Sequence, residues 1–433
     1  MNIFSETITK FKNPDNGSGP LWCFGSPTIM RGGDNLYASV MEVDDEAIPL
    51  NNTVLTLYHK YGDGEWERVF RDDFLQREPC PVATIPGKLI VSTNPSLRPK
   101  KTSGEREDGL SSRPALYFFD ITNNFPKFER AIVPNWDNAG YGFSSHTYRG
   151  LATDKNSGEI LLMNQCLTPD KDWQHCWALL DKNGAYINGG IIDYPVRSCY
   201  QSSAVKNGAA HSLAVSDIIE PNEEWRKYKK EQTGNDWDYD FRILYYSYAG
   251  DIRNGTFGKP VVVASADETC GQARPIDIYI DDNGDAHLLY YIRNVWHTFM
   301  RDKFFPDLQL RASFGYCRMS GGKIVEQYDI DGGKETERGK IGDFNGFFHV
   351  SKDKKLRVFY SRNNVRDENR PDGWHMTEIT DSGMTNPVKI PDLGVRSCFN
   401  VKPRMGAEPS DIADIYGADG GEIKYVRITL QRK

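Results

Sequence analysis

The sequence lacks the long apolar runs, the excess of basic charge and the cysteine spacings that mark several large classes of protein. No apolar run is long enough to cross a bilayer, so no membrane partner is expected. The formal net charge is −7, with 53 Lys and Arg against 60 Asp and Glu, which argues against a nucleic-acid partner. The eight cysteines form no C-x-x-C pair, so neither a zinc finger nor a disulfide scaffold is expected.

The N-terminal residues, MNIFSETITKFKNP, contain neither the apolar segment nor the cleavage site of a signal peptide. We therefore expect a cytoplasmic protein, or an extracellular or periplasmic one from which a leader has been removed. Hydrophobic residues make up 39% of the chain, which is too many for a disordered protein. The 39 Gly and 23 Pro suit many short strands joined by turns.

One pattern recurs along the chain: a short apolar strand, a tight polar turn and a second apolar strand. Turns of the D-x-N-G, N-G and G-G kind, as in IDIYI-DDNGD-AHLLYYIRN, are typical of β-hairpins. The pattern ends near seven positions: Asn35, Lys88, Glu159, Ala209, Asp285, Lys355 and Glu422. A four-stranded blade needs roughly 40 to 50 residues, so each repeat has room for one blade and its loops. The sequence predicts an all-β fold, a single seven-bladed β-propeller over residues 1–433.

The last repeat is too short for four strands. The N-terminal segment SETITKFK is therefore predicted to supply its outer strand and to close the ring. Two long connections, 217–242 and 294–311, interrupt the repeats. The first is charged and partly helical in pattern, and the second is rich in aromatic residues and Arg. Such connections usually carry function or shield it.

In a propeller, the connections into the innermost strands and those out of the second strands open on one face around the axis. Their side chains predict a ring of pocket residues. The positions before innermost strands include Trp22, Arg77, Glu78, His146, Tyr148, Arg197, Tyr200, Arg274, Asn345, Lys402 and Arg404. The second-strand exits include Asp217, Arg293, Asn294 and Arg362. Arginine forks suit carboxylates and sulfates, so an acidic carbohydrate is the expected partner.

His146, in SSHTYRG, is the first candidate for catalysis, because a histidine can be neutral near pH 7 and accept a proton. Tyr200, in RSCYQSS, starts the next blade, with Arg197 three residues before it. Together they suit β-elimination from a uronic acid. Arg197 would neutralise the carboxylate, His146 or Tyr200 would remove the C5 proton, and Tyr200 would protonate the leaving oxygen. Substrate-binding roles are expected for Arg77, Glu78, Arg274, Arg293, Asn294, Asn345, Arg362 and Trp22.

Other functions stay open. Glu42, Glu78, Asp217 and Asp343 are carboxylates from which a glycosidase pair would come, but nothing in the sequence selects two of them. A non-catalytic propeller that binds glycan or protein is a further alternative. No cofactor is predicted and no H-x-x-x-H or His/Asp cluster suggests a metal site, although a structural Ca²⁺ or Zn²⁺ in the channel stays open.

Through D-x-N-G-x-A-H-L-L-Y and the related hairpins, the chain resembles the sialidase-like BNR propellers. Within them it is most similar to the seven-bladed group of ulvan lyases, rhamnose–glucuronate lyases and a related α-L-rhamnosidase. The resemblance implies a lyase in which His146 and Tyr200 match the base and acid and Arg197 matches the arginine that neutralises the uronate. A rhamnosidase-like hydrolase is the alternative. A sialidase is disfavoured, because no Arg precedes Pro27 in CFGSP and no complete S-x-D-x-G-x-x-W box is present.

Overall fold

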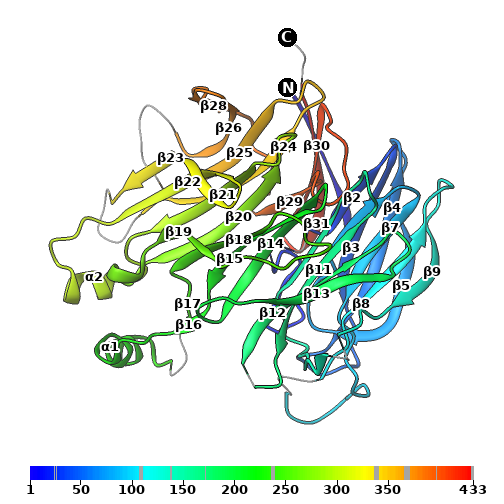
Figure 1. The fold of residues 1–433 in the computed structure, drawn as a ribbon, viewed down its shortest axis with the longest axis horizontal. Coiled ribbons are helices and arrows are strands. Elements are labelled where there is room, and N and C mark those ends of the chain that lie inside the picture. The colour runs from blue at the N-terminus through cyan, green and yellow to red at the C-terminus, as the bar shows by residue number, and fades with distance from the viewer. Residues whose placement is uncertain are drawn as a thin grey trace.

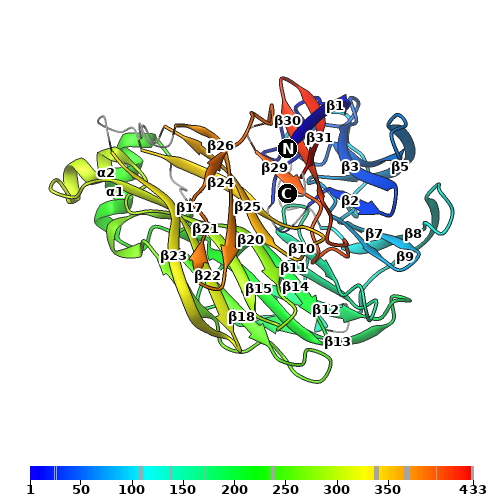
Figure 2. The same cartoon turned by 90° about the horizontal axis from the view of Figure 1, so that it is seen from above.

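The computed structural model describes residues 1–430 except 24, 26, 107–110, 137–138, 171, 236–238, 336–340, 365–370 and 396. The described residues form seven antiparallel sheets that follow one another around a ring (Figures 1 and 2). This is the predicted seven-bladed β-propeller. Each blade begins with its innermost strand, and neighbouring innermost strands contact one another around the axis.

The strands of the blades, from the inside outward, are as follows. Blade one has β2 (Ile29–Gly32), β3 (Asn35–Val43), β4 (Thr53–Tyr61) and β5 (Glu67–Gln76), and blade two has β6 (Val82–Ile85), β7 (Lys88–Thr93), β8 (Ala115–Asp120) and β9 (Lys127–Ile132). Blade three has β10 (Arg149–Thr153), β11 (Ile160–Leu167), β12 (Trp173–Leu180) and β13 (Tyr186–Ile192), and blade four has β14 (Ser198–Lys206), β15 (Ala209–Ser216), β18 (Ile243–Ala249) and β19 (Val261–Ser265). Blade five has β20 (Gln272–Ile280), β21 (Ala286–Arg293), β22 (Arg311–Ser320) and β23 (Lys323–Lys334), and blade six has β24 (Asp343–Val350), β25 (Leu356–Asn363) and β26 (Gly373–Thr380), with the short β27 (Gly383–Met384) and β28 (Val388–Lys389) both pairing with β26. Blade seven has β29 (Cys398–Asn400), β30 (Ile412–Asp419), β31 (Glu422–Thr429) and β1 (Asn2–Lys10).

The N-terminal strand closes the ring, as predicted. β1 pairs with β31 antiparallel, from Asn2 opposite Thr429 to Lys10 opposite Glu422. Figure 2 shows the blue N-terminal strand beside the red C-terminal strands. The edge that β31 would otherwise expose is therefore covered by the other end of the chain.

The burial of the second strands explains why the hairpins could be predicted from the sequence. A second strand is covered on both faces by neighbouring blades, so β11 reads as a nearly continuous apolar run and is buried from Ile160 to Cys166. An outer strand such as β9 has no buried residue and is rich in charge. The apolar core thus lies between the blades and close to the axis.

Six of the seven predicted hairpins join an innermost strand to a second strand. The seventh, which ends near Glu422, instead joins β30 to β31, the second and third strands of the last blade. Its innermost strand, β29, has only the three residues CFN. Three residues are too few to show the periodicity by which a strand is recognised in sequence.

The segment between β29 and β30 crosses the ends of the innermost strands. The carbonyl of Met405 accepts a hydrogen bond from Thr84 N (2.8 Å), at the end of β6, and that of Arg404 accepts one from Thr153 N (2.9 Å), at the end of β10. Gly406 has a φ of 94°, and a Cβ there would lie 1.9 Å from the Thr84 carbonyl oxygen. Only glycine allows this approach, so the segment is fitted closely against the ring.

Asp277 in β20 compensates the cations that this segment buries. Its Oδ2 lies 2.5 Å from Lys402 Nζ and its Oδ1 lies 3.8 Å from Arg404 Nε. Arg404 Nη1 also donates to the carbonyls of Leu151 (3.4 Å) and Ser203 (3.1 Å). Burial lowers the pKa of Lys402, and Asp277 opposes that effect. Lys402 and Arg404 were predicted at the mouth of the pocket, and this prediction is wrong: they lie buried at the ends of the innermost strands.

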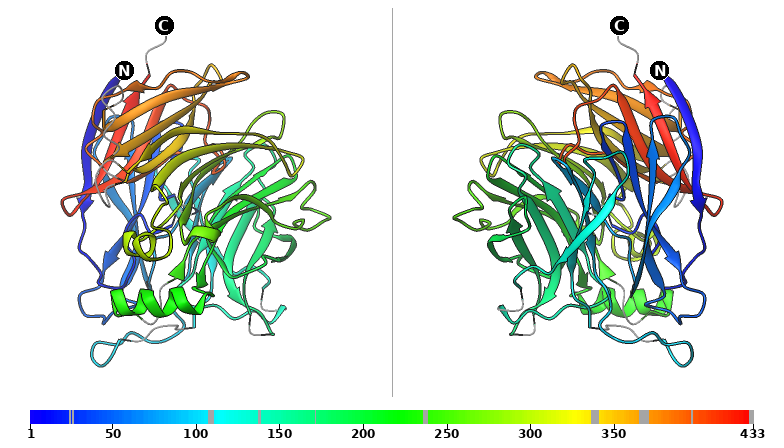
Figure 3. Two further views of the ribbon diagram at one scale, coloured as in Figure 1. Left: turned by 90° about the vertical axis from the view of Figure 1, so that its left-hand side faces the viewer. Right: turned by 90° about the vertical axis from the view of Figure 1, so that its right-hand side faces the viewer.

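The two long connections form a helical layer beside the ring. The first contains β16 (Ile218–Ile219), α1 (Glu223–Thr233) and β17 (Tyr239–Asp240), and the second contains α2 (Thr298–Phe304). Figures 1 and 2 show α1 and α2 side by side, and Figure 3 shows α1 at the same end of the ring as the cyan loop after β7. Neither helix in the described parts of the chain is long and apolar enough to cross a membrane.

The buried ion cluster at Asp277 predicts a large effect of neutralising that residue. In Asp277→Asn, Lys402 and Arg404 remain buried without a carboxylate, so the free energy of unfolding should fall by about 3–5 kcal/mol. Asp282→Asn is the matched control, since Asp282 contacts Lys206 and Lys354 at the surface and should cost at most about 1 kcal/mol. Equal losses in urea titrations of the two variants would contradict the proposed role of Asp277.

Two buried histidines predict an acid-labile fold. Burial lowers the pKa of His175 and of His349 to about 4, and the Nε2 of each lies 2.7 Å from a backbone carbonyl, that of Ser198 and that of Ser410. Between about pH 6.5 and pH 4 the unfolded chain binds protons that these folded histidines do not, so stability should fall as the pH falls, by up to about 3 kcal/mol for each. Glutamine preserves donation from the Nε2 position. Unfolding curves of the double variant His175→Gln/His349→Gln should therefore depend less on pH than those of the wild type, and parallel profiles would refute this account.

Candidate active site

Trp22 joins the candidate residues of blades three and four. Its ring stacks on Tyr148 with centroids 6.0 Å apart and an interplanar angle of 13°. The same ring lies 5.5 Å from His146 and 6.0 Å from Tyr200. The predicted base, the predicted acid and a predicted sugar-binding aromatic residue are thus one cluster at the starts of β10 and β14.

A glycine allows the segment around Trp22 to reach this position. A Cβ on Gly25 would lie 1.5 Å from the carbonyl oxygen of Gln201, in β14. Cys23 Sγ lies 3.8 Å from the carbonyl oxygen of Arg149, in β10. The chain that leads from β1 into blade one therefore passes directly against the innermost strands of blades three and four.

Glu78 fixes the orientation of His146. Its Oε1 lies 2.7 Å from His146 Nδ1, and both of its carboxylate oxygens accept from Thr147 N at 3.1 Å. An ionised carboxylate only accepts hydrogen bonds, so Nδ1 is the donor of this contact, and the neutral tautomer that makes it has its lone pair on Nε2. Glu78 is 2% exposed, whereas the His146 side chain is 27% exposed. Glu78 is thus placed to orient His146, and the substrate-binding role expected for it stays a prediction.

Arg197 is held at one edge and exposed at the other. Its Nε lies 3.1 Å from Asp217 Oδ2, and Asp217 is buried while the Arg197 side chain is 27% exposed. Burial raises the pKa of Asp217, and the charges of Arg197 and His146 oppose that rise. The Asp217 carboxylate therefore lies close enough to interact electrostatically with both groups. The guanidinium approaches Asp217 through Nε, so Nη1 and Nη2 can present an edge to an external carboxylate in the plane of the guanidinium.

Tyr200 has a backbone conformation that is rare for a large side chain. Its φ is 51°, and it lies where the pairing of β14 with β15 is irregular, between Cys199 and Ser202. Strain of this kind clusters at functional sites. Burial raises the pKa of Tyr200, so the phenol is protonated at neutral pH. A phenol in this state can donate a proton.

Two aromatic residues that the sequence did not single out flank Arg197. The guanidinium carbon lies 5.9 Å from the ring centroid of Trp173 and 5.1 Å from that of Tyr239. Trp173 begins β12, and Tyr239 belongs to the long connection after β15. The one available signal was the aromatic content of NDWDYDF within a charged insertion.

A second group of predicted residues lies between blades five and six. Arg274 pairs with Asp343, and its guanidinium lies 4.3 Å from the ring centroid of Tyr291. Asn345 and Arg274 line one cavity of 540 Å³. The guanidinium of Arg293 lies 5.5 Å from the ring of Trp296. Arg274, Arg293 and Asn345 belong to blades five and six, whereas the cluster around Trp22 lies at the starts of blades three and four, so their substrate-binding roles stay predictions.

Three predicted binding residues have partners within the protein. Arg77 is buried and donates from Nε to the Asn16 carbonyl (2.9 Å), which holds the N-terminal segment. Asn294 donates to the Gln309 carbonyl (2.9 Å) and thereby ties together the two ends of the second insertion. Arg362 is fully buried, with its Nε 2.9 Å from Asp331 Oδ2. Position in the repeat does not reveal these partners, which are distant in sequence, and the substrate-binding roles of the three residues stay predictions.

In the described part of the chain, no three His, Cys, Asp or Glu side chains gather in a way that could hold a metal ion. The side chains gathered at the cluster comprise an oriented imidazole, a protonated phenol and a partly exposed guanidinium.

No protein-family model matches the chain, and no curated protein matches it. Among solved structures it is similar to a polysaccharide lyase, an ulvan lyase of family PL25, with a TM-score of 0.52 and 12% identity over 96% of this chain and 93% of that one. A structure of such a lyase bound to -[GlcA(1-4)Rha3S]- matches with a TM-score of 0.52 and 13% identity over 97% and 95% of the two chains. At this identity the similarity establishes a shared fold. The resemblance expected from the hairpins therefore holds at the level of architecture.

Proposed function

We propose that this protein is a carbohydrate-active enzyme that cleaves an acidic polysaccharide by β-elimination at the cluster around Trp22. The observation that carries the proposal is the contact between His146 Nδ1 and Glu78, which directs Nε2 away from the buried carboxylate. Arg197 and Tyr200 supply the other two groups that the reaction needs. The fold shared with the ulvan lyase agrees with the proposal without deciding it.

The reaction follows from the properties of these side chains. The Nη edge of Arg197 pairs with the uronate carboxylate and stabilises the negative charge that develops when the C5 proton leaves. His146 Nε2 accepts that proton, and the imidazolium that forms is stabilised by Glu78. The electron pair of the C5–H bond forms the C4–C5 double bond as the C4–O bond breaks. Tyr200 donates its phenolic proton to the leaving oxygen, because burial keeps the phenol protonated.

The carboxylates near the cluster favour elimination over hydrolysis by a carboxylate pair. Glu78 is engaged by His146 and Thr147, and Asp217 by Arg197. Both are buried, so neither is free to protonate a glycosidic oxygen or to activate water on a sugar. A rhamnosidase-like hydrolase and a non-catalytic glycan-binding propeller are the alternatives that the experiment below distinguishes.

The proposal predicts that the protein generates the ultraviolet absorbance of a 4,5-unsaturated uronate from ulvan or another uronate polysaccharide. His146→Ala and Tyr200→Phe should each reduce the initial rate by about 10²–10⁴-fold, because each removes a proton-transfer group. Arg197→Gln should also abolish most of the activity. Arg130→Gln, on the outer strand of blade two, is the matched control and should retain the wild-type rate.

The other outcomes separate the alternatives. New reducing ends without the absorbance would indicate a hydrolase, and binding without any product would indicate a non-catalytic propeller. Wild-type rates in folded His146→Ala and Tyr200→Phe proteins would exclude this cluster as the active site.

A further inference from the structure

The insertion between β15 and β18 delivers an exposed aromatic ring to Arg197. Tyr239 is 42% exposed, yet its ring lies over the Arg197 guanidinium. Trp173, from the neighbouring blade, contacts the same guanidinium with its ring. Aromatic rings that contact a guanidinium by its face leave the in-plane N–H groups for an anion. The exposed part of each ring is in turn an apolar surface beside that anion.

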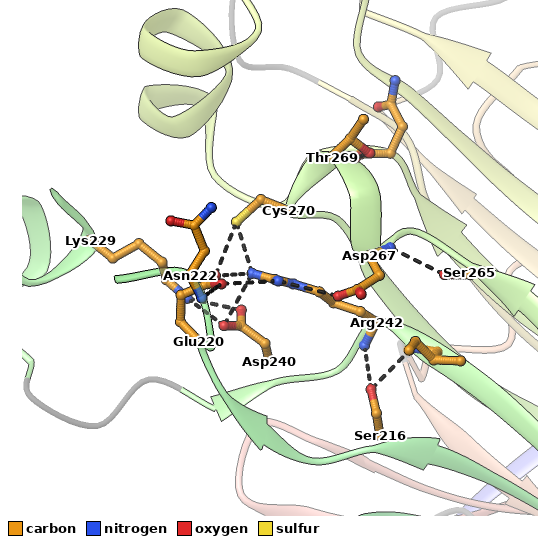
Figure 4. A network of polar contacts seen from close by, with 12 residues as sticks. Ser216, Glu220, Asn222, Lys229, Asp240, Arg242, Ser265, Asp267, Thr269 and Cys270 are labelled. Atoms are coloured by element: carbon orange, nitrogen blue, oxygen red, sulfur yellow. Dashed lines mark hydrogen bonds and ion pairs between the residues drawn. The ribbon is translucent and has the colours of Figure 1, made fainter. Parts of the chain in front are cut away.

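Tyr239 is held in place by its neighbour Asp240. The two form the short strand β17, which pairs with Ile218 and Ile219 of β16. Adjacent residues of a strand point to opposite sides, so Tyr239 points to Arg197 while Asp240 points into the protein. There Asp240 accepts from Lys229 Nζ at 2.8 and 3.0 Å, and all of these charged atoms are buried (Figure 4).

Arg242 completes this buried ionic network. It is 1% exposed, lies 3.2 Å from Asp240 through Nη2, and pairs with Glu220. Nη2 is also 3.0 Å from Cys270 Sγ (Figure 4). The guanidinium lies 5.6 Å from the ring of Trp225 in α1. A buried network of this kind loses stability when one partner is removed, so it fixes the insertion in a single position.

The second insertion supports the first from outside. Trp225 of α1 packs on Phe304 of α2 and on Phe305, with centroids 6.2 and 5.5 Å apart. Tyr228 packs on Phe299 at 5.9 Å. The two helices therefore pack on each other through aromatic side chains, and β17, which follows α1, carries Tyr239 to the site.

We infer that Tyr239 and Trp173 are specificity-determining residues, which bind the ring of the uronate whose carboxylate meets Arg197. The inference rests on the proposed function, because it takes the ligand of Arg197 to be an acidic sugar. Each pyranose has an apolar C–H face that packs on an aromatic ring, as in other sites where a few polar groups orient a ligand against aromatic walls. Lys229, Asp240 and Arg242 are then positioning residues for Tyr239.

The test measures binding of a uronate oligosaccharide by calorimetry in a His146→Ala background, where the expected turnover is too slow to disturb the measurement. Tyr239→Ala and Trp173→Ala should each weaken binding by about tenfold, since each removes an aromatic contact. Tyr239→Phe should bind like the parent. Tyr186→Ala, an equally exposed tyrosine on the outer strand of blade three, is the control and should also be unchanged.

The positioning role is tested by a double-mutant cycle. Asp240→Ala should weaken binding in the parent but have no further effect in Tyr239→Ala, because both changes remove the same contact. Additive losses would show that Asp240 acts through general stability and would refute its positioning role. Unchanged affinity in Tyr239→Ala, with the parent binding well, would overturn the inference while leaving the proposed function intact. Failure of the parent itself to bind any uronate would overturn both.

Discussion

The burial of Lys402 and Arg404 against Asp277 is the constraint on which the rest of the structure depends. These cations belong to the segment that follows the shortest innermost strand, β29, and the carboxylate belongs to blade five. The same segment is bonded to the ends of β6 and β10. The ion pairs with Asp277 and the hydrogen bonds to β6 and β10 thereby hold the innermost strands together at one end of the axis. The site can then be assembled at their other end from residues of several blades.

The cluster around Trp22 shows what this arrangement achieves. Glu78 precedes blade two, His146 precedes blade three, and Arg197 and Tyr200 lie at the start of blade four. Glu78 meets His146 across the boundary between blades two and three, and Arg197 meets Asp217 within blade four. The partners Glu78 and Asp217 are buried, whereas the side chains of His146 and Arg197 are each 27% exposed, so buried carboxylates orient side chains that stay open to solvent. Preorganisation of this kind is what the proposed proton abstraction requires.

Much of the fold was predictable because its signals are local. Turn residues between neighbouring strands of a blade revealed the hairpins, and the shortness of the last repeat indicated that the N-terminal segment completes it. The β29 strand was missed, since three residues carry no periodicity. The same loss of local signal explains the misplacement of Lys402 and Arg404, which followed from treating the last hairpin as an inner one.

The site was predictable only as a set of positions. Location at the start of an innermost strand was enough to select His146, Tyr200 and Arg197, which the structure brings to one cluster, and their roles stay predictions. That location does not reveal the partner of each arginine. Arg362 pairs with Asp331, 31 residues earlier in the chain, and no local pattern encodes that ion pair. Tyr239 could not be predicted, because it lies in an insertion, and the site positions were inferred from the repeat that the insertion interrupts.

The most direct test of the account is a crystal structure of the His146→Ala protein with a bound uronate oligosaccharide. We expect the carboxylate of one uronate to lie on the Nη atoms of Arg197, with its C5 facing the space left by the imidazole and its glycosidic oxygen within hydrogen-bonding distance of the Tyr200 hydroxyl. A sugar bound elsewhere on the ring, or one whose carboxylate points away from Arg197, would contradict the account.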